Sequence, residues 1–388
     1  MENIEKTTIC IIGAGPSGAA TALMLSKLKI PHIIIDKALF PRDKTCGDGL
    51  ILYAYRSLKI LGNQLFQDFL KHPKFIHSKK IQFHPNDHHH IEFKETEERD
   101  MVISYAKRID FDDFLVKHFS KTYTKTFFGS GVKIIKENKK GMQITLKNGK
   151  QIDAKLIVGA DGAKSTVYRN LVKDKISKKL ASTFISGYFN NVVLAKDNVA
   201  EIRLVYKKVT LFFYIFPLFD GKVNVSLGGR VDLIKKHNIN LIDEIQHIIQ
   251  HHKKVKGKFI HAEKDGNWRG WSIPFHFGKQ KTSGNGFLLV GDAAGLANPF
   301  YKEGIGTGMM SGIIAAKNIE RCVKENNFTA ENLKKYDQEL KDKFGRLLRF
   351  SFYALQVARF KSTFAFFTSL LKRKIESKSY GAIQKRSY

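Results

Sequence analysis

The sequence predicts an α/β fold that carries an α+β insert with an antiparallel sheet and ends in a helical tail. Residues 7–36 read as strand, helix and strand, and residues 287–319 repeat this style with a strand, a glycine-rich loop and a helix. Between them, residues 182–229 are rich in Phe, Val, Ile and Tyr, with a hairpin signal at Asp220-Gly221. We therefore expect a discontinuous first domain with a second sheet inserted into it.

The elements of the first domain can be justified in order. Residues 7–12 form an apolar strand, an Ala- and Leu-rich run to Leu28 predicts a helix, and residues 33–35 form a second strand that ends at Asp36. Residues 127–157 alternate short β-type runs with glycine turns, which predicts a three-stranded antiparallel meander.

Length and composition favour an ordered protein of more than one domain. The chain has 388 residues, of which 43% are hydrophobic and 26% charged. The three cysteines lie far apart in the sequence, which argues against a disulfide framework or a zinc site and favours a reducing, cytoplasmic location. Consecutive histidines at 88–90 would alternate in direction on an extended chain, so we expect no metal site there.

The charge is strongly unbalanced, with 66 Lys and Arg against 36 Asp and Glu and a net charge of +30. Such an excess attracts phosphate-rich partners or an anionic membrane. The basic residues are scattered and no aromatic-interleaved module is present, so no nucleic-acid partner is expected. No apolar run has the length of a spanning helix and no signal peptide is recognisable, so membrane contact is expected to be peripheral, at the inner face.

Residues 13–18, Gly-Ala-Gly-Pro-Ser-Gly, follow a strand and open a helix. Gly13 permits a tight turn, Gly15 lets a pyrophosphate approach the backbone, and Gly18 allows close packing of helix and strand. The helix N-terminus offers N–H groups and partial positive charge to phosphates. Asp36 sits where a carboxylate accepts hydrogen bonds from a ribose. This unit predicts a Rossmann-like dinucleotide-binding domain.

Two later segments point to a flavin dinucleotide. Residues 160–165, Ala-Asp-Gly-Ala-Lys-Ser, with Arg169 after them, match the second fingerprint of flavoprotein hydroxylases. In the third segment, residues 291–308, Asp292 can hold the ribityl hydroxyls, and the next helix would direct N–H groups at the flavin ring and favour an anionic reduced flavin. Three segments in this order predict FAD.

The chain resembles the geranylgeranyl reductase family, within the broader group of FAD enzymes similar to p-hydroxybenzoate hydroxylase. Residues 41–50, Pro-Arg-Asp-Lys-Thr-Cys-Gly-Asp-Gly-Leu, carry the resemblance together with Arg108, Phe111-Asp112 and residues 291–308, and it covers about residues 7–320. Members of the family reduce isolated C=C bonds of prenyl chains on lipid or chlorophyll precursors. The resemblance implies that Arg42 and Arg108 contact the cofactor.

The resemblance also implies that Cys46 and Gly47 lie beside the isoalloxazine ring. A thiol there is one proton source, while the alternative for Cys46 is a small buried filler. Residues 212–217 imperfectly resemble the aromatic and proline pattern of the family's substrate cavity, and alternate side chains on a strand share one face. Plain core packing is the alternative for each of them. Residues 268–274 resemble a halogenase motif with one residue too many, and we interpret them as structural.

The tail from residue 333 to 374 is predicted to form one or two long helices. Apolar residues recur at three- and four-residue spacing, which is typical of a core-facing stripe. Basic residues surround them, so docking at a membrane interface is the second interpretation. The stripe comprises Phe350, Tyr353, Val357, Phe360, Phe364, Phe367 and Leu371.

These inferences define predicted domains and sites. The FAD-binding domain comprises residues 1–75, 101–180 and 275–325, the substrate domain residues 76–100 and 181–274, and the basic helical region residues 326–388. The predicted catalytic residues are Cys46 and Gly47, the substrate-binding residues Phe212, Tyr214, Phe216 and Pro217, and no metal ligand is predicted. The predicted cofactor-binding residues are Gly13, Gly15, Pro16, Ser17, Gly18, Asp36, Lys37, Arg42, Cys46, Gly47, Arg108, Asp161, Gly162, Gly291, Asp292, Gly304, Ile305 and Gly306.

The predicted function is FAD-dependent reduction of C=C bonds in a prenyl lipid by hydride transfer. Only one dinucleotide fingerprint is present, so NAD(P)H or a reduced electron-transfer protein is expected to donate electrons transiently. One alternative is an FAD-dependent monooxygenase or halogenase that acts on an aromatic or polyketide substrate. Another is a prenyl-lipid carrier resembling Rab escort proteins, against which the intact glycines and aspartates of the three segments argue.

Overall fold

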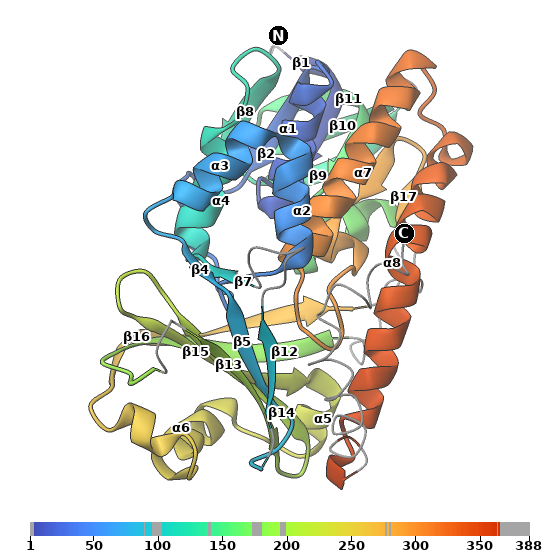
Figure 1. Cartoon of the computed structure of the whole chain (residues 1–388). Coiled ribbons are helices and arrows are strands. Elements are labelled where there is room, and N and C mark those ends of the chain that lie inside the picture. The colour runs from blue at the N-terminus through green and yellow to red at the C-terminus, as the bar shows by residue number, and fades with distance from the viewer. Residues whose placement is uncertain are drawn as a thin grey trace.

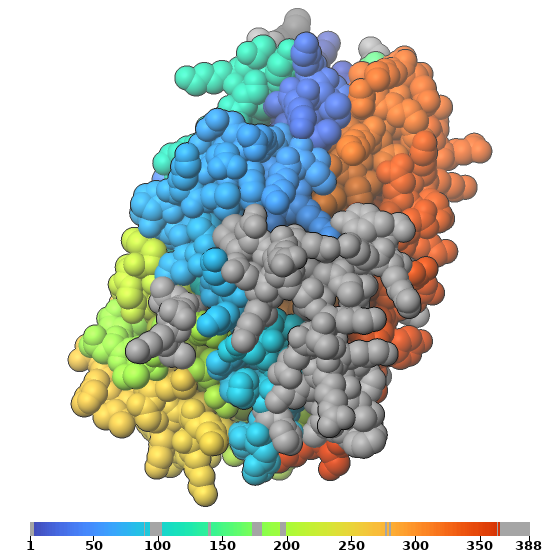
Figure 2. All heavy atoms as spheres, viewed as in Figure 1, coloured from blue at the N-terminus to red at the C-terminus, as the bar shows by residue number. Residues whose placement is uncertain are grey.

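The computed structural model describes residues 4–88, 90–94, 103–138, 141–172, 181–194, 199–275, 278, 281–362 and 364. Two large sheets lie one above the other, and one long helix, α8 (Ala330–Val357), runs down one side past both (Figure 1). In the space-filling view, the helices that cover the first sheet occupy the upper half of the molecule, and α6 (Leu241–His251) lies at the lower end (Figure 2).

The first sheet has eight strands, with a path in the order β17-β18-β11-β1-β2-β8. Its centre is parallel, and β9 and β10 extend β11 as the predicted antiparallel meander. The central strands are apolar and buried because helices cover the sheet. The bounds are β1 (Glu5–Ile12), β2 (His32–Asp36), β8 (Thr124–Phe128), β9 (Val132–Asn138), β10 (Gly141–Leu146), β11 (Gln151–Gly159), β17 (Ser283–Gly284) and β18 (Phe287–Leu289).

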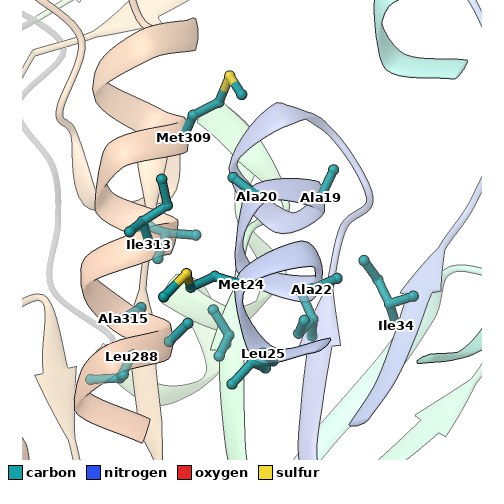
Figure 3. Packing of buried hydrophobic residues seen from close by; sticks show 14 of the residues in the cluster. Ala19, Ala20, Ala22, Met24, Leu25, Ile34, Leu288, Met309, Ile313 and Ala315 are labelled. Atoms are coloured by element: carbon teal, nitrogen blue, oxygen red, sulfur yellow. The ribbon is translucent and has the colours of Figure 1, made fainter. Parts of the chain in front are cut away.

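Two helices of the first sheet, α1 (Pro16–Lys27) and α7 (Ile305–Lys324), pack along each other through small residues (Figure 3). Gly312 permits the close approach, because a Cβ there would overlap the carbonyl oxygen of Ser17. Cβ atoms at Gly291 and Gly308 would likewise overlap the Ser17 hydroxyl. The first and third glycine segments, almost 280 residues apart in the sequence, therefore touch.

Further helices complete this part of the molecule, and a small three-stranded sheet lies between the two large ones (Figure 1). The helices are α2 (Leu52–Leu61), α3 (Asn63–Lys71) and α4 (Arg108–Lys117), and the strands are β3 (Gly49–Leu50), β4 (Ile76–Ser78) and β7 (Ile103–Tyr105).

The second sheet has seven strands in the order β16-β12-β15-β14-β13-β5-β6. All its pairings are antiparallel except β13 with β5. That pair departs from the predicted antiparallel sheet because β5 enters from the first part of the chain, so no hairpin sets its direction. The bounds are β5 (Lys80–His84), β6 (Ile91–Lys94), β12 (Ala181–Asn190), β13 (Ala200–Tyr206), β14 (Thr210–Pro217), β15 (Val223–Arg230) and β16 (Glu263–Pro274).

The two faces of the second sheet differ in their neighbours. Phe213 and Ile215 of β14 pack towards α5 (Val231–Lys236) and α6, whereas Phe212 and Tyr214 belong to the core on the opposite face. The strand alternation therefore separates a core under α6 from a second core that faces the first sheet.

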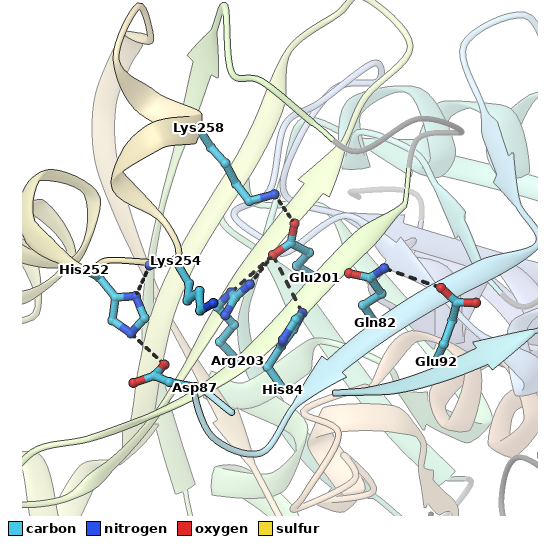
Figure 4. Close-up of polar contacts among 9 residues, drawn as sticks. All are labelled: Gln82, His84, Asp87, Glu92, Glu201, Arg203, His252, Lys254 and Lys258. Carbon is cyan, nitrogen blue, oxygen red and sulfur yellow. Dashed lines mark hydrogen bonds and ion pairs between the residues drawn. The ribbon is translucent and has the colours of Figure 1, made fainter. Parts of the chain in front are cut away.

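A buried ion cluster links β13 and β5 of the second sheet to the segment that follows α6 (Figure 4). Arg203 donates to Glu201 at 2.9 Å, Lys258 pairs with the same carboxylate, and His84 lies 3.9 Å from it. Burial disfavours the charge on Glu201, but the hydrogen bonds from Lys258 and Arg203 outweigh it and lower the pKa of the carboxyl group. The cluster joins the loop after α6 to β13.

The C-terminal helix α8 differs from expectation in its phase. Its inner row contains Leu348, Ser351, Leu355 and Ala358, which are buried. The predicted core-facing stripe instead points outward, with Phe350 60%, Tyr353 66% and Phe360 64% exposed. The reason is that the small residues of the inner row fit close to neighbouring elements: Asn298 donates to the Ser351 hydroxyl and Thr210 of the second sheet donates to the carbonyl oxygen of Ala358. The larger aromatic stripe therefore falls on the other side of the helix. Of the remaining stripe, Phe364 is buried, and Phe367 and Leu371 lie outside the described residues.

Within the part of the chain that the structure describes, no helix is both long enough and apolar enough to cross a bilayer.

Candidate functional site

The first glycine segment forms a candidate anion-binding site next to two arginines. Gly15 is the N-cap of α1, with Pro16 at the first helical position. A Cβ at Gly15 would lie 3.5 Å from Nη2 of Arg42 and 4.0 Å from Nη2 of Arg108. The helix N-terminus and two guanidinium groups therefore converge on one point, an arrangement suited to a diphosphate.

Asp112 holds both arginines in place. Its carboxylate accepts two hydrogen bonds of 2.7 Å from Arg108, in the same helix, and pairs with Nη1 of Arg42 at 2.9 Å. Asp112 is fully buried and Arg108 nearly so. Asp36 also lies 4.0 Å from Nη2 of Arg42, so two carboxylates balance the two guanidinium groups, whose Nη2 atoms lie beside the Gly15 turn.

Asp36 stabilises the same turn by accepting backbone hydrogen bonds. Its Oδ2 accepts the N–H of Ala14 at 2.8 Å, and its Oδ1 accepts that of Ala38 at 2.9 Å. Gly13 has φ of 104°, and a Cβ there would overlap the carbonyl oxygen of Ala160. The tight turn thus packs directly against the second glycine segment, and each carboxylate oxygen keeps a lone pair for a further donor.

Asp161 in the second segment serves partly as a local cap. Its Oδ2 accepts the backbone N–H groups of Thr166 at 2.6 Å and Val167 at 3.2 Å, while its buried Oδ1 has no partner among the described residues. Gly162, with φ of 77°, lies near the Lys44 ammonium. The segment therefore presents one carboxylate oxygen that is still free to accept a hydrogen bond.

The third segment brings Asp292 close to Gly304, the N-cap of α7, where a Cβ would lie 3.0 Å from Asp292 Oδ1. Burial raises the pKa of Asp292, and the nearby Lys44 and Arg108 oppose the shift. The first turn of α7 differs from expectation, because Gly306 donates its N–H to the carboxylate of Glu303, whereas the N–H groups of this turn were expected to face the flavin ring. Burial raises the pKa of Glu303 to about 7.

A cavity of about 240 Å³ opens from these segments towards the second sheet. Phe212, Tyr214 and Phe216 line it from one face of β14, and Pro217 does not. Tyr214 stacks on Phe216 with centroids 5.3 Å apart, and Phe184 stacks on Tyr214 and on Trp271. Gly47 and Ile305 line the end of the cavity nearest to the glycine segments.

Cys46 lines the same end of the cavity. Its half-buried side chain has a raised pKa, mainly because of desolvation, although Arg108 opposes the shift. The group therefore remains a thiol at neutral pH rather than a nucleophilic thiolate.

Several polar residues of this region escaped the sequence-based site prediction. Asp48 is fully buried and accepts hydrogen bonds from Tyr188 and Asn224. Lys302 is buried at the cavity, with its ammonium 5.0 Å from the ring of Phe212, and burial lowers its pKa to about 7. A charged residue within the glycine-rich third segment was the one available signal for Lys302.

Trp271 was also missed, since residues 268–274 were interpreted as structural, yet its side chain lines the cavity. Trp268 fits that interpretation, because it packs against Phe189 on the α6 side of the sheet. Among the predicted cofactor residues, Lys37 is exposed, and its Cβ lies beside Gly131 in the turn before β9.

Comparisons with known proteins fit this geometry. A menaquinone reductase of Mycobacterium tuberculosis is 24% identical over 327 residues, covering 81% of this chain and 77% of the relative. A digeranylgeranylglycerophospholipid reductase of Thermoplasma acidophilum is 22% identical over 368 residues, covering 88% and 85%. A Pseudomonas fluorescens chlorinase for a 1H-pyrrole-2-carbonyl peptidyl-carrier protein is 22% identical over 359 residues, covering 85% and 79%.

A solved structure shares the fold over the whole length. It is a geranylgeranyl bacteriochlorophyll reductase-like protein from Thermoplasma acidophilum, with a TM-score of 0.83 at 18% identity, covering 99% of each chain. The family model described as FAD binding domain matches residues 6–351. The chain therefore belongs to this family of FAD-dependent oxidoreductases, and it fits the geranylgeranyl reductase-like members among them.

Proposed function

We propose that this FAD-dependent oxidoreductase reduces C=C bonds in a long apolar lipid of the prenyl type. The observation that carries the proposal is the cavity of about 240 Å³, which begins at Cys46 and Gly47 and has mainly aromatic and aliphatic walls. Such walls select an apolar chain, because each CH₂ group removed from water gains about 0.8 kcal/mol. The names of the prenyl-lipid reductase relatives support the same substrate class.

FAD fits the three glycine segments on structural grounds. A side chain at Gly13 is excluded, the backbone at Gly15 faces two guanidinium groups, and a buried carboxylate oxygen of Asp161 has no hydrogen-bond partner among the described residues. In the proposed arrangement Arg42 and Arg108 bind the diphosphate at the N-terminus of α1. The other residues proposed to hold FAD are Pro16, Ser17, Gly18, Asp36, Gly162, Gly291, Asp292, Gly304, Ile305 and Gly306.

Bound and reduced FAD would supply the hydride, which carries both electrons of the reduction. The protein contributes a dry cavity, the position of the substrate and a proton. We propose that Phe212, Tyr214 and Phe216 press the apolar chain against the end of the cavity, where Cys46 and Gly47 lie. Excluding water there protects the reduced cofactor from side reactions.

An anaerobic turnover experiment tests the proposal. Protein reduced with dithionite is mixed with geranylgeranyl lipids or a menaquinone, and flavin reoxidation is followed by absorbance while the lipid is analysed by mass spectrometry. Reoxidation with gain of two hydrogens per turnover is the expected result. Tyr214→Ala should slow the reaction with long chains. Phe213→Leu, on the opposite face of the same strand, should keep the wild-type rate.

The second candidate function is an oxygen-dependent monooxygenase or halogenase. The chlorinase relative favours it, and so does Trp271, whose indole lines the cavity beside Phe184. Product that forms only with oxygen, and only from an aromatic or polyketide compound, would replace the reductase proposal. A colourless purified protein that still bound prenyl lipid would favour the carrier alternative.

We propose that NAD(P)H or a reduced electron-transfer protein donates electrons without a permanent site. Mixing the oxidised protein with NADH, NADPH or reduced ferredoxin in a stopped-flow instrument identifies the donor by the rate of flavin bleaching. Bleaching that is slower than turnover with every donor would contradict this proposal.

We also propose that the outer face of α8 docks on an anionic membrane. This face comprises Phe350, Tyr353, Val357 and Phe360, and Phe350 also lines the cavity, so the exposed stripe continues from the cavity mouth. Residues 343–361 contain five basic residues and no acidic one. Aromatic side chains that enter the interface, together with basic groups near lipid phosphates, are typical of interfacial helices.

Vesicle sedimentation tests the docking. The double variant Phe350→Ser/Tyr353→Ser should lose at least tenfold in affinity for vesicles that contain phosphatidylglycerol, and added salt should weaken the wild type. Ile260→Ser is the matched control, because Ile260 is 72% exposed but far from α8 in sequence and fold. Equal binding of all three proteins, or a dimer held by this face, would refute the membrane as partner.

A further inference from the structure

Cys46 separates two cavities of different character. On one side lies the apolar cavity of about 240 Å³. On the other side lies a cavity of about 30 Å³, whose lining includes the polar residues Tyr188, Asn267 and Arg269. Asn267 and Arg269 are exposed, so the small cavity lies at the surface. Its volume exceeds the roughly 10–15 Å³ that a water molecule requires.

Asp48 lies behind Cys46 and is connected to the small cavity by Tyr188. The Tyr188 hydroxyl donates to Asp48 Oδ2 at 2.9 Å, and Asn224 donates to the same oxygen at 2.8 Å. Oδ1 of Asp48 is buried and has no hydrogen-bond partner among the described residues. A buried carboxyl group with one unpartnered oxygen has a place for a proton.

Asn224 fixes the position of this carboxyl group relative to Cys46. Its amide nitrogen also donates to the carbonyl oxygen of Cys46 at 2.9 Å. The hydroxyl groups of Ser186 and Ser226 donate to its amide oxygen at 2.8 and 2.7 Å, which prevents the amide from turning over. The thiol of Cys46 in turn interacts with the backbone N–H of Asp48.

The charged surroundings keep the proton of Asp48 exchangeable near neutral pH. Burial raises its pKa to about 7, while the hydrogen bonds from Asn224 and Tyr188 and the charge of Arg108 in α4 oppose the shift. Asp43 adds to the rise, and Lys107 lies 5.3 Å from the Tyr188 ring. Cys46 keeps its proton at this pH, as described above.

We propose that Asp48 is a proton-positioning residue that delivers protons through the Cys46 thiol to the apolar cavity, and that Tyr188 reloads it from the small polar cavity. The inference rests on the proposed alkene reduction. Saturating one C=C bond adds a hydride to one carbon and a proton to the other. The thiol gives that proton and regains one from the Asp48 carboxyl group, and the carboxylate regains one from solvent through the Tyr188 hydroxyl. One solvent proton is consumed per bond.

Asp48→Asn is the primary test. Asp48 has φ of 63°, a conformation that Asn adopts readily, so the variant is expected to fold. Anaerobic product formation should fall roughly 100-fold, as for loss of a general acid. The fall in wild-type rate above neutral pH should disappear, while FAD content and reduction by dithionite stay unchanged. A wild-type rate and pH profile in this variant would overturn the proposal.

Two pairs of further variants separate proton transfer from structure. Tyr188→Phe should slow the reaction and lower its solvent isotope effect. Tyr206→Phe should change neither, because its buried hydroxyl has no hydrogen-bond partner among the described residues and so no link to Asp48. Cys46→Ser should retain activity because a hydroxyl group carries protons, and Cys46→Ala should lose it. Equal activity of the two Cys46 variants would contradict a relay through this side chain.

A second measurement is independent of any alkene. The rate at which iodoacetamide alkylates Cys46 is followed against pH by peptide mass spectrometry, since Cys10 and Cys322 are fully buried. Asp48→Asn removes a neighbouring negative charge and should shift the midpoint to lower pH, while Tyr206→Phe should not. An unchanged midpoint overturns the link between Asp48 and Cys46. A shifted midpoint without reduction of any alkene supports the link and refutes the proposed function.

Discussion

Gly13 shows how a glycine of the first segment is constrained both by its backbone conformation and by its neighbours. It has φ of 104°, and a Cβ there would overlap the carbonyl oxygen of Ala160. Gly149 has a similar φ of 89° but nothing within 4 Å of a Cβ. Gly149→Ala should therefore cost only about 1–2 kcal/mol of backbone strain. Gly13→Ala should cost more and should abolish FAD binding.

Flavin absorbance per protein and urea unfolding check this pair of variants. If both variants lost the same amount of bound FAD and of unfolding free energy, the packing of Gly13 against the second segment would add nothing beyond the conformation of the turn. A Gly13→Ala protein that retained bound FAD would contradict the proposed position of the diphosphate.

Asp48 should also leave a mark on stability. Its pKa of about 7 lies above the unfolded value of 3.8, so the folded state holds the extra proton between these limits. Its contribution is therefore largest at low pH and is lost as pH rises towards 7. Between pH 5 and pH 8, loss of this contribution should lower the free energy of unfolding by about 3 kcal/mol, since one pKa unit is about 1.4 kcal/mol. In Asp48→Asn, urea unfolding should show a correspondingly smaller fall over this range.

The residues that sequence could identify are those whose role is local. Gly13, Gly15 and Asp36 lie within one βαβ unit, so the turn, the helix N-terminus and the strand end are visible together. Asp48 was missed because its partners Tyr188 and Asn224 lie 140 and 176 residues away. Such contacts follow from the docking of the two sheets, which no local pattern encodes.

At the scale of elements, the approach of α1 to α7 decides whether the first and third segments meet. A Cβ at Gly312 would overlap the Ser17 carbonyl oxygen and lie 2.6 Å from the Thr21 hydroxyl oxygen. Gly312→Ala should therefore push the helices apart and weaken FAD binding. Gly345→Ala in α8 is the matched control, because its Cβ would meet only Lys341 at an ordinary 3.5 Å.

The expected signs are opposite for the two variants. Gly345→Ala should stabilise the protein by about 0.5–1 kcal/mol, because alanine favours a helix interior over glycine. Gly312→Ala should destabilise it and raise the dissociation constant for FAD. Titration of FAD into stripped protein and thermal unfolding measure both quantities, and a stabilising Gly312→Ala would show that the helices tolerate a wider spacing.

For α8, the prediction of a helix is correct, but the prediction of which helix face is buried is wrong. A three- and four-residue spacing of apolar side chains correctly predicts a helix. It cannot decide which face is inside when the true inner row contains residues as small as Ser351 and Ala358. That choice depends on how closely the second sheet approaches, which is a property of the assembled fold.

At the scale of the whole molecule, α8 joins the two sheets. Tyr336 donates to the carbonyl oxygen of Leu289 at 2.6 Å in the first sheet. Further along the same helix, Arg230 donates to Gln356 at 3.1 Å, and Thr210 donates at 2.9 Å to the carbonyl oxygen of Ala358, directly after the helix. Both of these donors belong to the second sheet. Because α8 contacts both sheets, unfolding of one sheet should also destabilise the other.

This connection predicts that the two sheets unfold together and that FAD stabilises both. FAD at 100 times its dissociation constant should add about 2.7 kcal/mol to the free energy of unfolding, because it binds only the folded state. Flavin fluorescence reports the first sheet, and the fluorescence of Trp268 and Trp271 reports the second, since both tryptophans lie in β16. The two signals should change at one temperature, and that temperature should rise with added FAD. Replacing Tyr336 by Phe, which removes its hydrogen bond to Leu289, should lower both transitions equally. Two separate transitions, with only the flavin signal responding to FAD, would show that the second sheet folds on its own.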